Sequence, residues 1–355
     1  MTSVAAADRD VCFRLYRLMN LIRRTEEILA EEYHPANQMR CPMHLCIGQE
    51  AMPAALSMVI RPSDVLMTHY RSHGYYLAKG GSLDRMVAEF YGRASGANSG
   101  MAGSMELAAH EVNFSSGAIV SGQIGLALGA AFAAHYRGSD DIAVAVMGDG
   151  AMDEGVAYES LNMAALHRLP LLVICENNHY AAHTAIARRM AVPSPTGRVG
   201  GFGVPTLSAD GNDPEALLAL LRTVVADRRA GKGPLFLEIE TYRHCAHVGV
   251  TSDDAMGYRP LDEIDRWKQR DPVPAMRRKL LEAGAAASLL DETDAAIDAE
   301  VWASVAAAKA APFPTLAEAL TWNASGGYSP KVTGFVGTAA AAFNSAQAEA
   351  KLAPY

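Results

Sequence analysis

The sequence predicts an α/β protein, with a parallel sheet that carries helices on both faces and a helical C-terminal part. The central observation is a strand-helix-strand unit over residues 141–175, whose two strands are short apolar runs rich in Val, Ile and Leu. Such runs are typical of parallel strands that are buried on both faces. Two more apolar runs, at 65–68 and 235–242, continue the alternation of strands and helices that parallel sheets show.

The chain opens with a long amphipathic helix, which we predict over residues 8–33. Its apolar side chains recur at helical spacing and define one packing face: Val11, Leu15, Leu18, Ile22 and Leu29. We therefore expect an N-terminal helical segment at 1–40, an α/β domain at 41–260, and a C-terminal helical segment with a tail at 261–355.

The first strand of the expected domain, at 65–68, runs into a polar loop of residues 69–74. This loop contains Arg71, whose planar guanidinium offers two aligned donors and is a natural partner for a phosphate. A helix capped by Ser82 follows, and then a segment rich in glycine and serine at 96–117. We predict that this segment is one long loop, and long loops in compact domains are usually functional.

A helix with an unusually small face is predicted over residues 119–135. Its small residues lie in near-helical register: Gly122, Gly125, Gly129 and Ala133. A glycine in the middle of a helix costs roughly 1 kcal/mol relative to alanine, so another element must approach this face closely. The sequence leaves open whether that element belongs to this chain or to a partner.

Polar residues follow both strands of the central unit. Asp149 comes directly after the first strand and Asn178 after the second. A right-handed crossover makes the two strands parallel, so their carboxyl ends lie at the same edge of the sheet. We therefore expect both residues at the edge where parallel sheets bind ligands. A carboxylate, an amide oxygen and a free backbone carbonyl suit a Mg²⁺ ion that still has phosphate oxygens to bind. These residues predict a diphosphate held through magnesium.

The chain beyond the central unit continues the same architecture. Residues 181–202 contain prolines, glycines and arginines, and we predict a mobile loop at the sheet edge. A helix at 214–230 leads into the strand at 235–242. From about residue 262 the chain is rich in alanine and helical in pattern.

The central residues resemble the thiamine diphosphate signature, in which GDG is followed further along the chain by NN. Here 26 residues separate Gly150 from Asn177. With its surroundings, the stretch is similar to the alpha subunit of the first component of 2-oxo acid dehydrogenase complexes, of the pyruvate, branched-chain and acetoin types. The resemblance covers about residues 43–258. It implies a thiamine diphosphate-binding fold and an enzyme that decarboxylates a 2-oxo acid and passes the acyl unit to an acceptor such as lipoyl.

The same resemblance implies roles for individual residues. The expected cofactor-binding residues are His44, Tyr70, Arg71, Ile119, Val120, Gly148, Asp149, Gly150, Ala151, Asn178 and Tyr180. The expected magnesium ligands are Asp149, Asn178 and the backbone carbonyl of Tyr180. The main catalytic candidate is His247, which falls in the reactive region of the cofactor, and His73 is a second candidate whose role stays open.

The resemblance also implies a second chain. Thiamine chemistry needs a carboxylate that protonates the aminopyrimidine ring, and in the two-chain family a beta-type subunit supplies that glutamate. We therefore expect an α2β2 assembly with the site between chains, and a lipoyl-bearing acyltransferase is a candidate further partner. The protein then orients the cofactor, which acts as the electron sink.

Several positions depart from the family pattern. In the glycine-rich segment, Met101 and Glu106 stand where relatives carry a lysine and a histidine, and Val248 replaces a serine after the reactive-region histidine. Two extra residues also precede Ser252. We expect Glu106 to lie beside the substrate entrance, where its charge would disfavour a simple 2-oxo acid, so the acid and the acceptor stay open.

Composition excludes several other classes of protein. The net charge of −8 without a cluster of Lys and Arg argues against nucleic acid as a partner. Five scattered cysteines fit a reducing cytosol, and Cys41, His44 and Cys46 lack a fourth ligand for zinc. The first residues show neither an export signal nor a membrane-spanning run, which predicts a cytoplasmic protein without membrane contact.

Two nucleotide-binding motifs are not matched. Gly148, Gly150 and Gly155 lack the last spacing of the dinucleotide fingerprint, and Lys232 lacks the residues around a phosphate-loop lysine. Two alternatives on the thiamine diphosphate fold stay open. One is a biosynthetic carboligase or acyltransferase, and the other is a non-catalytic subunit that only holds the cofactor.

Overall fold

The computed structural model describes residues 6–39 and 41–323. The chain divides into two units, residues 1–313 and 314–355. The sheet lies in the first unit, and the second contains the described helix α13 (Leu316–Asn323). The finer division of residues 1–313 that the sequence suggested stays a prediction.

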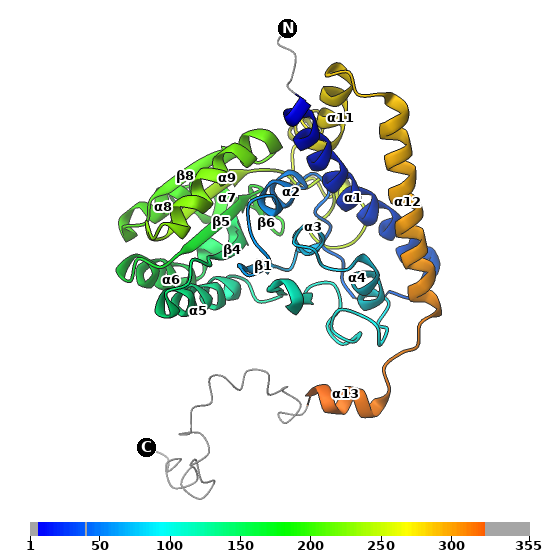
Figure 1. The fold of residues 1–355 in the computed structure, drawn as a ribbon, viewed down its shortest axis with the longest axis horizontal. Helices are drawn as coiled ribbons and strands as arrows, with labels where there is room; N and C mark the ends of the chain where they lie inside the picture. Colours follow the sequence, from blue (N-terminus) through cyan, green and yellow to red (C-terminus); the bar gives the residue numbers. More distant parts are fainter. Residues whose placement is uncertain (1–5, 40, 324–355) are drawn as a thin grey trace, which may run out of the picture. The chain divides into compact units, whose positions relative to one another are not determined.

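A seven-stranded sheet confirms the predicted fold class (Figure 1). Its spatial order is β2-β3-β1-β4-β5-β9-β8, and every neighbouring pair is parallel except β2 with β3. The strands in that order are Ala108–Ala109, Phe114–Gly117, Val65–His69, Ala143–Gly148, Leu171–Asn177, Leu235–Glu240 and Thr206–Asp210. A small antiparallel pair, β6 (Tyr180–Ala181) with β7 (Thr184–Ala185), lies outside the sheet.

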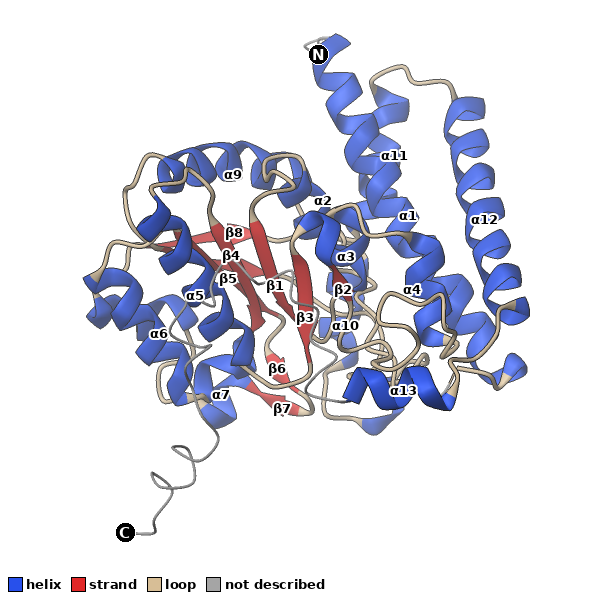
Figure 2. Cartoon of the chain, turned by 60° about the horizontal axis from the view of Figure 1, so that its bottom comes forward, coloured by secondary structure: helices blue, strands red, loops and turns tan. Residues whose placement is uncertain are grey.

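Helices cover both faces of the sheet (Figure 2). Successive residues of β4 point to opposite layers, so Ala145 packs in the cluster with α5 and α6 while Val144 packs in the larger cluster with α2 and α9. The four helices are α5 (Gly122–Arg137), α6 (Gly155–Leu166), α2 (Ala51–Ser57) and α9 (Pro214–Arg229). This two-sided burial explains why the β4 and β5 strands read as continuous apolar runs.

A group of helices lies beside this sheet (Figures 1 and 2). The predicted N-terminal helix is confirmed as α1 (Ala6–Ala36), which packs against α11 (Pro272–Glu282) and α12 (Ala287–Ala310). Arg23 of α1 pairs with Glu50 at 2.6 Å and with Asp271 at 2.9 Å. These buried contacts fix α1 to the start of α2 and to the cap of α11.

Short elements complete the described chain. They are α3 (His73–Ala78), α4 (Leu83–Phe90), α7 (Ile186–Arg189), α8 (Pro195–Val199) and α10 (Leu261–Lys268). The single loop expected at 96–117 is wrong in its second half, where β2 and β3 form. Their few residues carry no long apolar run, and pairing of β3 with β1 brings them into the sheet. None of the helices in the described ranges is both long and apolar enough to cross a membrane.

Candidate active site

A cavity of about 410 Å³ lies at the carboxyl edge of the sheet. The ends of β1, β4 and β5 and the start of α5 surround it. All the predicted site residues line it except His44 and His73: Tyr70, Arg71, Ile119, Val120, Gly148, Asp149, Gly150, Ala151, Asn178, Tyr180 and His247. Residues from distant parts of the sequence therefore meet at the edge where parallel sheets bind ligands.

One side of the cavity presents a buried carboxylate. Asp149 is 1% exposed, and burial raises its pKa while the charge of Arg189 opposes that rise. Arg189, from α7, forms an ion pair with Asp149 and a second one with Asp153 at 2.6 Å. The sequence placed Arg189 in the loop expected at 181–202, but its pairing with Asp149 was not predicted. The pair shows that a positive charge is accommodated at Asp149. Nearby, the side-chain oxygen of Asn178 accepts the backbone N–H of Tyr180 at 3.3 Å.

Another part of the wall presents a buried cation. Arg71 is 4% exposed, and its guanidinium donates to the backbone carbonyls of Leu45 at 2.7 Å and His247 at 3.1 Å. No carboxylate in the described ranges pairs with it, and burial lowers the pKa of Arg71. Since a buried charge without a counter-ion is costly, this arginine is well suited to an anionic ligand.

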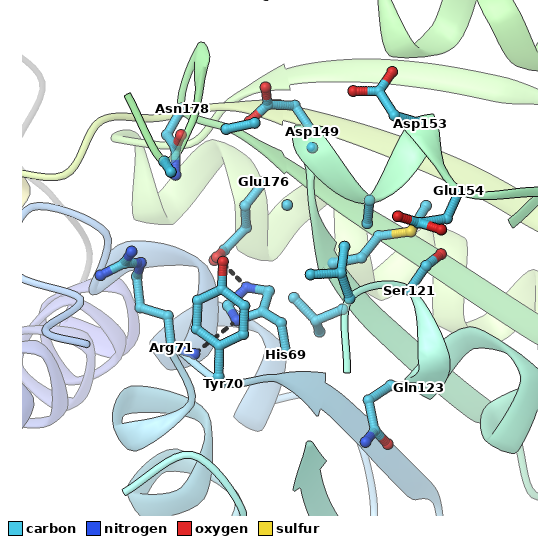
Figure 3. Close-up of a pocket in the computed structure, with 18 of the residues that line it drawn as sticks. His69, Tyr70, Arg71, Ser121, Gln123, Asp149, Asp153, Glu154, Glu176 and Asn178 are labelled. Atoms are coloured by element: carbon cyan, nitrogen blue, oxygen red, sulfur yellow. Dashed lines mark hydrogen bonds and ion pairs between the residues drawn. The ribbon is translucent and has the colours of Figure 1, made fainter. Parts of the chain in front are cut away.

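A contact between His69 and Glu176 connects the ends of β1 and β5 beside Arg71 (Figure 3). His69 Nδ1 accepts the backbone N–H of Arg71 at 3.1 Å, so the ring proton is on Nε2, which lies 2.9 Å from a Glu176 oxygen. Tyr75 donates to the other Glu176 oxygen at 2.6 Å. The contacts fix the Arg71 loop to the strand that precedes Asn178. Sequence reasoning missed both residues, although each lies at the end of a predicted strand.

Three rings pack together near the cavity. The centroids of His44 and Tyr70 are 4.6 Å apart, those of His44 and His247 5.4 Å, and those of Tyr70 and His247 5.9 Å. Burial, followed by the charge of Arg71, lowers the pKa of His44 to about 3 and that of His247 to about 4. Both imidazoles are therefore neutral at pH 7. His247 lines the cavity, whereas His44 contacts two residues that line it.

His73 has the surroundings of an interior residue. It is completely buried, with Nδ1 2.8 Å from Glu26 and Nε2 3.0 Å from the Ser104 hydroxyl. Glu26 also accepts the backbone N–H of Cys46 at 2.8 Å. These contacts connect α1 with the start of α3 and with the loops that carry Cys46 and Ser104. The catalytic role suggested for His73 stays a prediction.

The glycine-rich segment is organised by a buried acid. Glu89 of α4 is 1% exposed and accepts four backbone N–H groups at 2.7 to 2.9 Å, from Asn98, Gly100, Ala102 and Gly103. Glu106, by contrast, is exposed and is not one of the residues that line the cavity. The structure therefore gives no support for the expected effect of its charge on a bound acid.

The loop that carries His247 is stabilised by a second buried acid. Asp253 accepts from Arg259 at 2.5 Å and from Arg243 at 3.3 Å, and it also bonds the Tyr258 hydroxyl. Both arginines are nearly sealed from solvent, with side chains 1% exposed. Although burial raises the pKa of Asp253, the hydroxyl and the two guanidinium groups lower it more. The extra residues after His247 are thus contained in a loop with a fixed end.

Comparison with known proteins agrees with this geometry. A family model described as "Dehydrogenase E1 component" matches residues 17–317. The chain is similar to the pyruvate dehydrogenase E1 component subunit alpha of Rhizobium meliloti, with 36% identity over 90% of this chain and 91% of the relative. The corresponding subunit of Zymomonas mobilis is 37% identical over 89% of each chain. The human mitochondrial somatic form is 36% identical over 87% of this chain and 78% of the relative.

Proposed function

The chain belongs to the dehydrogenase E1 component family, and from this premise we propose which residues hold its cofactor and what partner completes its site. It is an alpha subunit of a thiamine diphosphate-dependent 2-oxo acid dehydrogenase, which decarboxylates a 2-oxo acid and transfers the acyl unit. The relatives do not favour the carboligase or the non-catalytic alternative. Pyruvate, the acid in their names, is the substrate to assay first.

The proposed diphosphate site rests on one observation: a sealed carboxylate, Asp149, lines the same cavity as a sealed guanidinium, Arg71, that has no acid partner among the described residues. We infer that Asp149, Asn178 and the Tyr180 carbonyl hold Mg²⁺, because hard oxygen donors suit it and leave positions for phosphate oxygens. Arg71 then neutralises part of the diphosphate charge. A metal at Asp149 competes with Arg189 for the same carboxylate.

Residues at the start of α5 suit the rest of the cofactor. Ile119 is 74% exposed and Val120 45% exposed, so they offer an uncovered apolar surface for rings. Ser121 Oγ and Gln123 Oε1 are buried and have no partner in the described chain. Both residues line the cavity, and such groups require a hydrogen-bond partner. When bound, thiamine diphosphate supplies the electron sink for decarboxylation.

Replacing Asp149 with alanine is expected to weaken Mg²⁺-dependent binding of thiamine diphosphate at least tenfold, or roughly 1.4 kcal/mol. The substitution removes the charged metal ligand. It also frees Arg189, whose positive charge can then neutralise part of the diphosphate in place of the lost metal ion. Calorimetric titrations of the cofactor at several Mg²⁺ concentrations therefore measure the metal dependence directly.

The matched control for this variant is Asp153→Ala. Asp153 lines the same cavity and also pairs with Arg189, but it lies outside the proposed ligand set. Its loss should change the affinity less than twofold. If Asp149→Ala keeps the wild-type dependence on Mg²⁺, the proposed metal site is wrong.

We propose that a beta-type subunit supplies the acid that activates the aminopyrimidine ring. Glu176 is a buried glutamate that lines the cavity, but Tyr75 and His69 already use both of its oxygens. Its contacts suit a residue that positions the wall of the site. The activating glutamate expected from the family is therefore assigned to the partner.

An uncovered apolar face on α5 and α6 supports this assembly. The exposed residues on it are Leu126, Phe132, Tyr136, Met163 and Leu166. Gly129 lies on the same stripe as Leu126, and a Cβ atom added to it would meet no described atom within 4 Å. Packing within the described chain does not account for this glycine, whereas the close approach of a partner helix would.

The chain alone is expected to show negligible turnover of 2-oxo acids, and co-expression with its beta partner should restore turnover as an α2β2 tetramer. The Gly129→Leu variant distinguishes an effect on folding from an effect on assembly. It should raise the free energy of unfolding of the free chain by roughly 0.5–1 kcal/mol, because leucine has a higher helix propensity than glycine. It should also weaken association with the partner at least tenfold, because the larger side chain prevents the close approach of the partner helix.

Urea unfolding of the free chain and analytical ultracentrifugation of the mixture measure these two effects. Ala226→Leu is the control, because Ala226 is exposed on α9, a helix that covers the other face of the sheet. Robust turnover by the single chain would refute the need for a partner. Normal assembly of Gly129→Leu would place the interface elsewhere.

A further inference from the structure

A second cavity lies at the opposite, amino edge of the sheet, and we call it the amino-edge cavity. Its volume is about 670 Å³. Its lining includes Asp141 and Pro170, which lie just before β4 and β5, and residues from the carboxyl ends of α5, α6 and α9. It is therefore separate from the candidate active site.

The unusual feature of this cavity is Arg228. The residue lies in the last turn of α9, lines the cavity and is 4% exposed. Its Nε and Nη1 atoms are buried and have no hydrogen-bond partner in the described residues. Burial lowers the pKa of Arg228, while the nearby charge of Asp227 opposes that shift without forming an ion pair with Arg228 in the described structure. An unpaired charge in such a position is costly unless an anion joins it.

The acids near Arg228 pair with other groups in the described structure. Asp227, whose charge acts on Arg228, forms an ion pair with Lys232 at 2.8 Å. Arg229 also lines the cavity but forms two contacts with Asp64, at 2.8 and 2.5 Å. Asp140 is paired with Arg61 at 2.7 Å, and Asp141 accepts from the Ser139 hydroxyl at 2.6 Å. The acids of the lining are thus bonded to other groups.

Arg168 adds a second guanidinium from another element. It lies between α6 and β5, is exposed, and has a left-handed backbone with φ of 51°. It lines the cavity and forms no ion pair within the described chain. Ser139, His135 and His167 also line the cavity and offer further polar groups.

The helix ends explain why an arginine is tolerated here but do not satisfy it. The carboxyl ends of α5, α6 and α9 carry partial negative charge, which favours a nearby cation. Yet no helix carbonyl in the described ranges accepts a hydrogen bond from Arg228. The local field thus keeps the side chain charged and leaves its donors for a ligand.

We propose that the amino-edge cavity binds a phosphate group, free or as a small phosphate monoester, between Arg228 and Arg168. A phosphate matches these residues because it can carry two negative charges and offers several acceptors to planar guanidinium donors. The ligand would connect the end of α9 with the turn that enters β5. This site is independent of the thiamine diphosphate site, so either proposal can fail without the other.

The test titrates inorganic phosphate into the assembled enzyme by calorimetry, at low ionic strength and with thiamine diphosphate and Mg²⁺ already saturating. Saturation of the cofactor site prevents phosphate from binding at Arg71. We expect saturable binding that Arg228→Met weakens at least tenfold. The control Arg222→Met removes an exposed arginine from the same helix and should leave binding unchanged. A parallel titration with glycerol 2-phosphate distinguishes the sources, since tighter binding than phosphate indicates a monoester and equal binding indicates free phosphate.

Thermal unfolding gives a second readout that a structural role for Arg228 would not produce. Without phosphate, Arg228→Met should be as stable as wild type or more stable, because it removes an unpaired buried charge. Added phosphate should raise the melting temperature of wild type and of Arg222→Met but not that of Arg228→Met. Absence of saturable binding, equal binding by Arg228→Met, or destabilisation of that variant in both buffers would overturn the proposal.

Discussion

Replacing His247 with alanine is expected to lower turnover of the assembled enzyme by roughly 10² to 10⁴, with little change in affinity for thiamine diphosphate. The imidazole lines the cavity, and its pKa of about 4 leaves it neutral at pH 7. A neutral ring there can donate a hydrogen bond to a developing oxyanion or pass a proton to the acceptor. Its loss should therefore affect the chemical step more than cofactor binding.

Steady-state kinetics and cofactor titration separate the two effects. His183→Ala is the control, because His183 is an exposed imidazole whose centroid lies 6.5 Å from that of His247. Equal losses of turnover and of cofactor affinity would identify His247 as a binding residue instead.

The same pKa has a consequence for stability. The folded-state pKa of His247 is lower than the ordinary value of 6.5, so the unfolded chain binds more protons between about pH 6.5 and pH 4. Stability from this group is therefore full above pH 6.5 and is lost as the pH falls toward 4. The alanine variant should lose less stability than wild type over that interval.

Asp253→Asn should cost roughly 3–5 kcal/mol of unfolding free energy, the range for breaking a buried ion pair by removing one partner. The substitution keeps the size of the side chain but leaves Arg243 and Arg259 without their shared carboxylate, and both are sealed from solvent. Urea unfolding, with the m-value fitted separately for each variant, measures this loss of unfolding free energy. The control is Asp254→Asn, since Asp254 contacts Arg259 only at 3.4 Å and is more exposed.

Two outcomes would contradict this expectation. A loss below about 1 kcal/mol would mean that the arginines find other acceptors or water when the loop opens. An equal loss in Asp254→Asn would mean that the whole acidic segment, and not the shared carboxylate, stabilises the loop. Faster proteolysis near His247 in Asp253→Asn alone would place the damage in this loop.

The central part of the site could be predicted because it depends on local pattern and one topological rule. The apolar runs of β4 and β5 are long enough to recognise, and parallel strands place Asp149 and Asn178 on one edge. The cavity indeed brings both residues together. Their roles as ligands stay a prediction until binding is measured.

The residues that were missed act through contacts distant in sequence. His69 and Glu176 are 107 positions apart, and Arg189 is 40 positions from Asp149. No periodicity links such pairs, and each residue alone reads as an ordinary polar side chain at a strand end or in a loop. Likewise, the sequence could not show that His73 points toward Glu26 of α1 while Tyr70 and Arg71, three and two residues earlier, face the cavity.

Short strands were hard to predict for a related reason. β2 and β3 contain few residues, and the segment around them is rich in glycine and serine, which normally indicates a loop. Their pairing depends on the free edge of β1, a tertiary property. Burial and not local propensity determines such strands.

The hydrogen bonds that hold the glycine-rich segment determine which of its residues can be substituted. Glu89 holds that segment through four backbone N–H groups, so these bonds do not depend on the side chains of Met101 and Glu106. The departures from the family pattern expected at Met101 and Glu106 therefore need not change the shape of the loop. Glu89 itself has no such freedom, since glutamine would place an amide donor against donors and aspartate is too short. Surface residues of this segment can thus be exchanged while one buried acid, Glu89, keeps the backbone in place.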